Sequence, residues 1–269
     1  MKRWKIGLPM YRDCAPADHQ QLLGDILAGL RKAGWTEPVD LVDDPGELGA
    51  FWRSADLLLG QACGYPLVTS LAGQVRLLGT PCYDFPGCSD YRYCSYIMVA
   101  ESASVRSLVD LRGARAAFNQ PHSQSGMNAL RHTIARLARH GRFFSSVVES
   151  GSHRASLQMV TNGQADVAAI DCVTHGYLAL HAPHVLDGLR ILCQTEHTAG
   201  LPLITSSKLD EATVTLLRQV LLQMFLPDAA DTPAARLRLT GFVATQIVDY
   251  DRILDARRLA HDRFYPELA

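Results

Sequence analysis

Short apolar runs alternate along the chain with stretches in which apolar residues recur every three or four positions. The run at residues 4–10 predicts a first strand, and residues 18–33 predict a helix that ends at Gly34. Further strands are predicted at residues 38–42, 56–60 and 74–79, with a brief helix at 67–72. This alternation indicates an α/β protein.

The alternation stops at residues 80–93, an irregular segment rich in Pro, Gly, Cys and Tyr, and then starts again. The second series predicts strands at 96–100, 114–118, 145–149 and 166–170, with helices at 127–140, 154–161 and 173–180. The remaining chain predicts a return crossing at 190–194, a strand at 203–205 and helices at 209–226, 232–239 and 247–264.

Two such series predict two lobes, each a mixed sheet flanked by helices. Lobe 1 is expected to contain residues 1–94 and 194–269, and lobe 2 residues 95–193, with two crossings between them. We expect a ligand cleft between the lobes, because ligands of such sheets lie beyond the carboxyl ends of the strands.

The stretch Phe118–Asn128 joins a predicted strand to a predicted helix through small residues, Ser123, Ser125 and Gly126. A helix start leaves its first N–H groups unpaired and carries partial positive charge. Serine hydroxyls at such a start favour binding of a small oxyanion. The alternative is that the serine is an ordinary N-cap.

Polar residues follow several other predicted strands. Ser152 and His153 follow one strand of the second lobe, and Asp171 follows another. We expect all three residues to lie near Ser123 and Ser125 and to be candidates for ligand binding. The first lobe is expected to contribute residues 11 and 61–65 from its own strand ends.

The nearly equal numbers of basic and acidic residues argue against an extended basic surface that would bind a polyanion. With 26 basic and 27 acidic residues, no nucleic-acid or anionic-membrane partner is expected, and nothing indicates more than a monomer. No apolar run reaches the about 20 residues that a membrane span needs. The apolar run after the basic N-terminus is too short for a signal peptide, which predicts a cytoplasmic protein or a mature form whose leader was replaced by a start codon.

Seven cysteines, an odd number, exclude a complete disulfide framework. Cys82, Cys88 and Cys94 recur at six-residue steps, and a Cys82–Cys88 bridge is sterically conceivable, but free thiols are the favoured prediction. No Cys-x-x-Cys or His-x-x-x-His pair accompanies them, so no metal site is predicted.

Catalysis is the weaker interpretation. Ser152, His153 and Asp171 are triad residue types, and Cys63 and Cys172 are potential nucleophiles. Adjacent residues at one helix start rarely face each other, however, and the sequence has no Gly-x-Ser-x-Gly elbow. Rossmann and P-loop fingerprints are also absent, so no catalytic residue and no cofactor is predicted.

Several stretches together carry a family resemblance: DLRGARAAFN (110–119), SQSGMNAL (123–130), SGSHRAS (150–156), GQADVAAIDC (163–172) and LPLITS (201–206). Residues 8–11 and 61–66 match more loosely. With these, the sequence resembles the phosphate, phosphite and phosphonate substrate-binding proteins of ABC transporters. The resemblance implies the type II periplasmic-binding-protein fold, with two hinge crossings.

The resemblance also implies roles for site residues. Ser123, Ser125 and the Gly126 amide would hold the oxyanion. His153 would donate a hydrogen bond, with a positive charge near neutral pH adding complementarity, and Asp171 would accept from a protonated ligand oxygen or an amine. The alternatives are a solvent-facing histidine and an aspartate that only caps its helix.

Aromatic side chains are candidates for a wall around a small organic group. Tyr11 and Tyr65 are the stronger candidates. A weaker set of ligand-binding candidates comprises Gln61, Tyr83, Arg92, Tyr93 and Gln124. Arg92 would clamp the anion if it turned inward, whereas Asn128 is expected to support the loop.

The function predicted from these observations is capture of a small phosphorus oxyanion for an ABC transporter, by hinge closure near residues 93–97 and 192–195. The transporter permease would be the partner, and the location would be periplasmic. The missing leader favours an alternative, a cytosolic small-anion sensor of the same fold that acts through a signalling partner protein.

Overall fold

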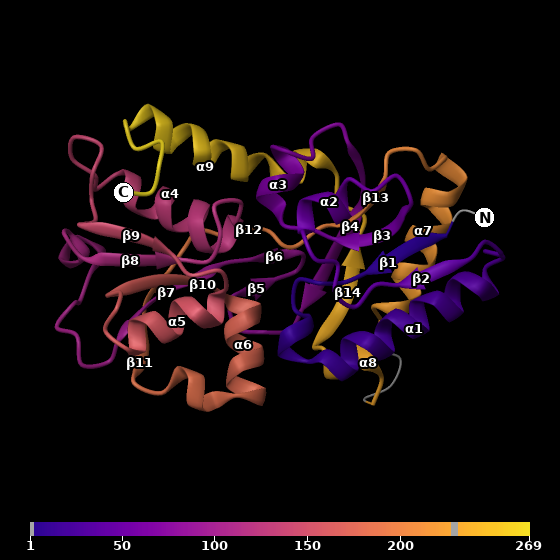
Figure 1. Cartoon of the computed structure of the whole chain (residues 1–269), viewed down its shortest axis with the longest axis horizontal. Helices are drawn as coiled ribbons and strands as arrows, with labels where there is room; N and C mark the ends of the chain where they lie inside the picture. Colours follow the sequence, from indigo (N-terminus) through magenta and orange to yellow (C-terminus); the bar gives the residue numbers. More distant parts are fainter. Residues whose placement is uncertain (1–2, 227–230) are drawn as a thin grey trace. The chain divides into compact units, whose positions relative to one another are not determined.

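The computed structural model describes residues 3–226 and 231–269 (Figure 1). The chain forms two compact units. Unit 1 comprises Met1–Asp84, Ser89–Arg92 and Ala199–Asp249, and unit 2 comprises Phe85–Cys88, Tyr93–Thr198 and Tyr250–Ala269. Each unit contains its own mixed sheet with helices, as the sequence predicts.

The sheet of unit 1 has six strands in the order β14-β4-β13-β3-β1-β2. The strands are β1 (Trp4–Gly7), β2 (Val39–Leu41), β3 (Leu57–Gln61), β4 (Val75–Tyr83), β13 (Leu203–Ser206) and β14 (Leu239–Val243). β1 pairs in parallel with β2 and β3, whereas β13 and β14 run antiparallel to their neighbours. The helical segments are η1 (Arg12–Cys14), α1 (Pro16–Lys32), α2 (Leu48–Trp52), α3 (Gly64–Val68), α7 (Glu211–Met224) and α8 (Pro233–Arg236).

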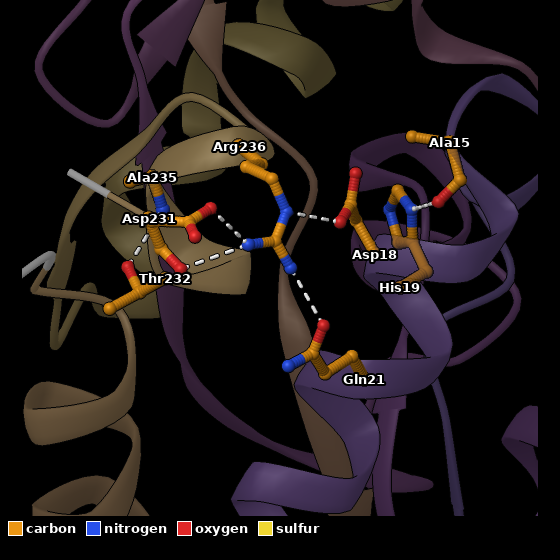
Figure 2. A network of polar contacts seen from close by, with 8 residues as sticks. All are labelled: Ala15, Asp18, His19, Gln21, Asp231, Thr232, Ala235 and Arg236. Atoms are coloured by element: carbon orange, nitrogen blue, oxygen red, sulfur yellow. Dashed lines mark hydrogen bonds and ion pairs between the residues drawn. The ribbon is translucent and has the colours of Figure 1, made fainter.

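Helix α1 shows how the apolar stripe in the sequence becomes a packing face. Leu22, Ile26 and Leu30 are buried on one side, and the helix packs against α7 and α8. Arg236 of α8 also binds α1, because its Nε donates to Asp18 Oδ1 at 2.6 Å and its Nη2 donates to Gln21 Oε1 at 2.7 Å (Figure 2). This polar network fixes a helix of only four residues, which would be marginal alone.

The sheet of unit 2 has five strands in the order β11-β7-β10-β8-β9. They are β7 (Ser95–Ala100), β8 (Arg115–Phe118), β9 (Ser146–Glu149), β10 (Val167–Asp171) and β11 (Leu189–Gln194). β8 is parallel to both β9 and β10, and β7 is antiparallel to β10 and β11. The helical segments are η2 (Leu108–Leu111), η3 (Gln124–Asn128), α4 (Ala129–Ala135), α5 (His153–Thr161), α6 (Cys172–His181), η4 (Pro183–Leu186) and α9 (Asp251–Asp262).

Helices cover both faces of this sheet: α4 and α9 lie on one side, and α5 and α6 on the other (Figure 1). Every residue of β10 is therefore buried, which explains its continuous apolar sequence before Asp171. The core includes Ile97, Val99 and Val167, and α9 and its C-terminal extension add Ala260 and Tyr265.

Several predicted elements have different limits in the structure. The irregular segment 80–93 contains the end of β4 and two short strands, β5 (Cys88–Ser89) and β6 (Arg92–Tyr93), which form a small sheet with β12 (Thr198–Ala199). Residues 190–194 are not a plain crossing but most of β11, which pairs with β7.

The predicted brief helix at 67–72 lies earlier, as α3 (Gly64–Val68), and two other helix predictions also change. The predicted helix 232–239 is wrong beyond Arg236, because Arg238 adopts a φ of 57° and turns the chain into β14. The predicted helix 127–140 starts earlier, as the π-helical turn η3, and ends at Ala135. His140 and Gly141 both have positive φ, which a helix does not accommodate.

The assignment of all of residues 194–269 to the first lobe is wrong. Residues 250–269 belong to unit 2, because α9 packs against α4 and η3. Residues 85–88 also belong to unit 2, so the chain passes between units after Asp84, Cys88, Arg92, Thr198 and Asp249 rather than at two places. In the described part of the chain, no helix has both the length and the apolar character needed to cross a membrane.

The close packing of Phe85 against α6 generates a stability prediction. A Cβ added at Gly176 would lie 2.6 Å from Phe85 Cγ, so Gly176→Ala must displace the ring. Overpacking of this kind costs about 1–3 kcal/mol. We expect Gly176→Ala to lower the Tm in a thermal melt.

Gly24→Ala is the matched control. Gly24 lies inside α1, and nothing stands within 4 Å of an added Cβ. Alanine is favoured over glycine in a helix by about 1 kcal/mol, so this variant should raise the Tm. An equal rise in both variants would contradict the packing of Phe85 on α6.

Candidate functional site

The candidate site of unit 2 begins at the carboxyl ends of three neighbouring strands. β8 lies between β9 and β10, parallel to both, so all three strands end at the same edge of the sheet. The loops that follow are joined by the Gly151 N–H, which donates to the Asn119 carbonyl at 2.9 Å. The predicted convergence of the chain after these strands is thus confirmed within unit 2.

Ser123 is the N-cap of η3. Its Oγ accepts a hydrogen bond from the Gly126 N–H at 3.0 Å, and its carbonyl accepts one from the Asn128 N–H at 3.0 Å. Ser123 therefore has the ordinary capping role that the sequence left open. The Gly126 amide, predicted to donate to an anion, donates to Ser123 in this structure.

Ser125 and His153 form the central polar pair of the site. Ser125 Oγ and His153 Nε2 are 2.9 Å apart, and Ser125 is only 4% exposed. His153 is the first residue of α5, so the contact joins the starts of two helices. A Cβ at Gly126 would lie 3.3 Å from His153 Cε1 and 2.8 Å from Asn119 Cγ. Glycine at 126 therefore allows Asn119 and His153 to approach the same turn.

Two buried polar atoms of this group have no hydrogen-bond partner among the described residues: His153 Nδ1 and Asn119 Oδ1. Burial lowers the pKa of His153 to about 4, with only a partial opposing effect from the Ala169 backbone. The imidazole is therefore neutral at pH 7. The prediction of a positive charge near neutral pH is wrong for this structure, because desolvation disfavours the charged ring.

Asp171 and Ser152 are helix caps. Asp171 is buried at the end of β10, and its Oδ1 accepts from the Thr174 N–H at 2.8 Å at the start of α6. The Ser152 Oγ accepts from the Ala155 N–H at 3.1 Å at the start of α5. The structure thus shows for Asp171 the capping role that was the alternative to ligand binding.

Gln124 and Asn128 belong to a buried network behind η3. Asn128 Nδ2 donates to Gln124 Oε1 at 2.6 Å, and its Oδ1 accepts from Arg131. Arg131 in turn donates to the Pro266 carbonyl at 2.7 Å. Asn128 therefore supports the turn, as expected, and the Gln124 side chain is engaged in that support.

The candidates of unit 1 form a separate group. The rings of Tyr11 and Tyr83 meet edge to face with centroids 5.5 Å apart, and Gln61 Nε2 donates to the Tyr83 hydroxyl at 3.5 Å. Tyr11 and Gln61 are both buried. Tyr65 is buried on α3, where its carbonyl accepts from the Thr69 hydroxyl at 2.6 Å.

Arg92 does not turn inward within unit 1. Its side chain is exposed, and its guanidinium lies 5.8 Å from the centroid of the Tyr91 ring. Tyr93, the next residue, is buried and belongs to unit 2.

The described residues contain no cluster of three or more His, Cys, Asp or Glu side chains able to hold a metal ion. None of the seven cysteines, all of which lie in the described part of the chain, forms a disulfide, and Cys82 Sγ donates to Asp90 Oδ1 at 3.5 Å. The contact of Cys172 with Cys88, together with burial, raises the pKa of the Cys172 thiol, so it is not an activated nucleophile.

Ser125 and His153 have the residue types, and their Oγ and Nε2 atoms the separation, that are typical of a catalytic nucleophile and its general base. A third group normally orients the histidine, yet His153 Nδ1 lacks a hydrogen-bond partner in the part of the chain that the structure describes.

Asn119 is a polar residue of this group that the sequence analysis did not identify as a candidate. Its place directly after β8 is the signal that would have identified it.

Comparisons with solved structures give similar folds over nearly the whole chain. PhnD1 from Prochlorococcus marinus, in complex with methylphosphonate, has a TM-score of 0.78 at 16% identity, covering 96% of this chain and 97% of that one. A phosphonate-transporter binding protein from Pseudomonas aeruginosa (PA3383) has a TM-score of 0.75 at 15% identity, covering 97% and 87%. XAC2383 from Xanthomonas citri, bound to ATP, has a TM-score of 0.72 at 17% identity, covering 98% of each chain.

No curated protein sequence matches the chain significantly. A family model does match, over residues 54–250, and it describes an ABC transporter, phosphonate, periplasmic substrate-binding protein. This match spans well over half of the chain and includes every strand of unit 2's sheet. The chain therefore belongs to the phosphonate substrate-binding proteins of ABC transporters, which have the type II periplasmic-binding-protein fold.

Proposed function

We propose that this chain captures a small phosphorus oxyanion, namely a phosphonate, phosphite or phosphate, at the Ser125–His153 pair and delivers it to a transporter permease. The observation that carries the proposal is the combination of this partly buried pair with Asn119 Oδ1 and His153 Nδ1, two atoms that have no hydrogen-bond partner within the described residues. Family membership supports the ligand class.

The proposed binding mode uses neutral hydrogen-bond donors. With the imidazole neutral, Nε2–H donates to Ser125 Oγ, and the Ser125 hydroxyl hydrogen is then directed to a ligand oxygen. The Gly126 N–H exchanges Ser123 Oγ for a second ligand oxygen. Fixed dipoles of this kind stabilise an anion with little reorganisation.

Asp171 gives the proposed site its selectivity for protonated ligands. Its carboxylate is buried at the same edge of the sheet, and a buried carboxylate repels a full dianion. A ligand oxygen that carries a hydrogen donates to the carboxylate instead. The site is therefore expected to favour the monoanion.

Unit 1 is proposed to complete the site. Tyr11 and Tyr83 form an aromatic surface with Gln61 beside it. Such a surface suits the organic substituent of a phosphonate. In this proposal, hinge closure brings the two units around the ligand, with Tyr65, Ser152, Tyr93, Gln124 and Arg92 as further candidate contacts.

A thermal-shift screen tests the ligand class. The purified chain is heated with phosphate, phosphite, methylphosphonate, aminoethylphosphonate, ATP, sulfate and small carboxylates. A ligand at about 100 times its Kd adds about 2.7 kcal/mol of stability. A selective rise in Tm with a phosphorus oxyanion is expected, and a response only to carboxylates would overturn the proposal. ATP is included because XAC2383 was solved with it.

Ser125→Ala should weaken binding of the ligand that the screen identifies. Loss of one partner of a buried oxyanion costs about 1–3 kcal/mol, which corresponds to roughly 5- to 150-fold in Kd, measured by calorimetry. Ser107→Ala is the control, because Ser107 caps η2 outside the site. The control should keep the parental Kd, and equal binding by both variants would remove Ser125 from the site.

His153 should also make stability depend on pH. Its pKa in the folded protein, about 4, lies below the value near 6.5 of an unfolded histidine. The unfolded chain therefore takes up a proton first, and stability should fall as pH drops from about 6.5 to 4. His153→Gln should remove this component, whereas His184→Gln, at an exposed position, should retain it. NMR titration of the His153 ring with a midpoint near 6.5 would contradict this prediction.

A further inference from the structure

Three cysteines that the proposed function does not use gather at the start of α6. The Sγ atoms of Cys88 and Cys172 are 3.6 Å apart. Cys94 adjoins them, because its carbonyl accepts from the Cys172 N–H at 3.1 Å and its thiol contacts that of Cys172. We call these three residues the thiol cluster. All three belong to unit 2.

The segment that carries Cys88 is held tightly in place. A Cβ at Gly87 would lie 2.9 Å from both Cys94 Sγ and Cys172 Cβ, so only glycine allows this approach. Tyr96 donates its hydroxyl hydrogen to the Pro86 carbonyl at 2.5 Å. Phe85 packs edge to face on Tyr177 with centroids 4.9 Å apart. The thiols of Cys88 and Cys172 are therefore kept near each other although the two residues are 84 positions apart in the sequence.

The members of the cluster differ in access to solvent. Cys88 is partly exposed, whereas Cys94 is 2% exposed and Cys172 is completely buried. Burial and mutual contact raise the pKa of both Cys94 and Cys172, so these two stay protonated at neutral pH. An oxidant from solvent must therefore reach Cys88 first.

We propose that Cys88 and Cys172 are a redox-active pair that forms a reversible disulfide with small-molecule disulfides as oxidants. The Cys88 thiolate attacks one sulfur of the oxidant RSSR, forming a mixed disulfide and releasing RS⁻. The Cys172 thiol then gives up its proton as its sulfur attacks Cys88 Sγ, and the second RS⁻ leaves. The two protons lost by the cysteines convert these into two RSH molecules. The sulfurs must approach from 3.6 Å to the bonded distance of about 2.05 Å.

The Cys88–Cys172 pair adjoins Asp171, the acidic residue proposed to contact the ligand. Cys172 directly follows Asp171, whose carboxylate caps the helix that Cys172 begins. The disulfide would tie the start of α6 to residues 85–88, and the chain passes into unit 1 on both sides of that segment. Oxidation should therefore weaken oxyanion binding several-fold. This consequence rests on the proposed function, whereas disulfide formation does not.

The pairing is tested on the full chain with oxidised glutathione, followed by mass spectrometry and peptide mapping. The expected product lacks two hydrogens and links the Cys88 and Cys172 peptides, and dithiothreitol reverses it. Cys88→Ser should abolish the link, whereas Cys193→Ser, a partly buried cysteine of the same unit, should retain it. A stable glutathione adduct on Cys88 without the link, or a Cys94–Cys172 link, would overturn the proposal.

The effect on binding is measured separately, with methylphosphonate and inorganic phosphate as probes for the reduced and oxidised chain. A several-fold higher Kd after oxidation, absent in Cys88→Ser, supports the coupling, and an unchanged Kd overturns it. If neither form binds a phosphorus oxyanion, the proposed function fails, while peptide mapping still decides whether the pair forms.

Discussion

The parallel pairing of β8 with β9 and β10 is the constraint on which the candidate site depends. It brings three chain segments, distant in sequence, to one edge of one sheet. Because β10 is buried along its whole length, a slip of one residue would turn every side chain to the opposite face. The packing of the core therefore also fixes where Asp171 and the loops after β8 and β9 lie.

Close approach at Gly126 brings further polar side chains to the helix caps at this edge of the sheet. Without a Cβ at that position, the Asn119 side chain and the His153 ring both reach the turn that carries Ser125. The same crowding desolvates His153 and keeps it neutral. Burial thus favours a neutral, positioned hydrogen-bonding group over a charged one, an arrangement that would suit reversible binding selected by geometry.

Periodicity was sufficient to predict most strands, α1 and the position of Ser125, His153 and Asp171 after strands that end at one edge of the sheet, because these follow from local patterns and the rules of parallel sheets. Periodicity did not predict features that depend on contacts between residues distant in sequence. The apolar stripe of α9 indicates that this helix packs, but not that it packs on α4. Leu239–Val243 became a strand because it pairs with the edge of β4. The pKa of His153 depends on desolvation, which no spacing of residues reveals.

The charges around the proposed site indicate how it would discriminate between ligands. Ser125 and His153 are neutral, and Arg92 is exposed and lies over the Tyr91 ring within unit 1. Asp171, buried at the carboxyl end of β10, brings an acid to this edge of the sheet and would disfavour excess negative charge on a ligand bound there. Selectivity would then depend on the protonation state of the ligand, which sets both its net charge and the hydrogens that it can donate to Asp171. In the proposed binding mode, a phosphonate or phosphite monoanion, with one acidic hydrogen and one apolar face, would satisfy both the neutral donors and the carboxylate.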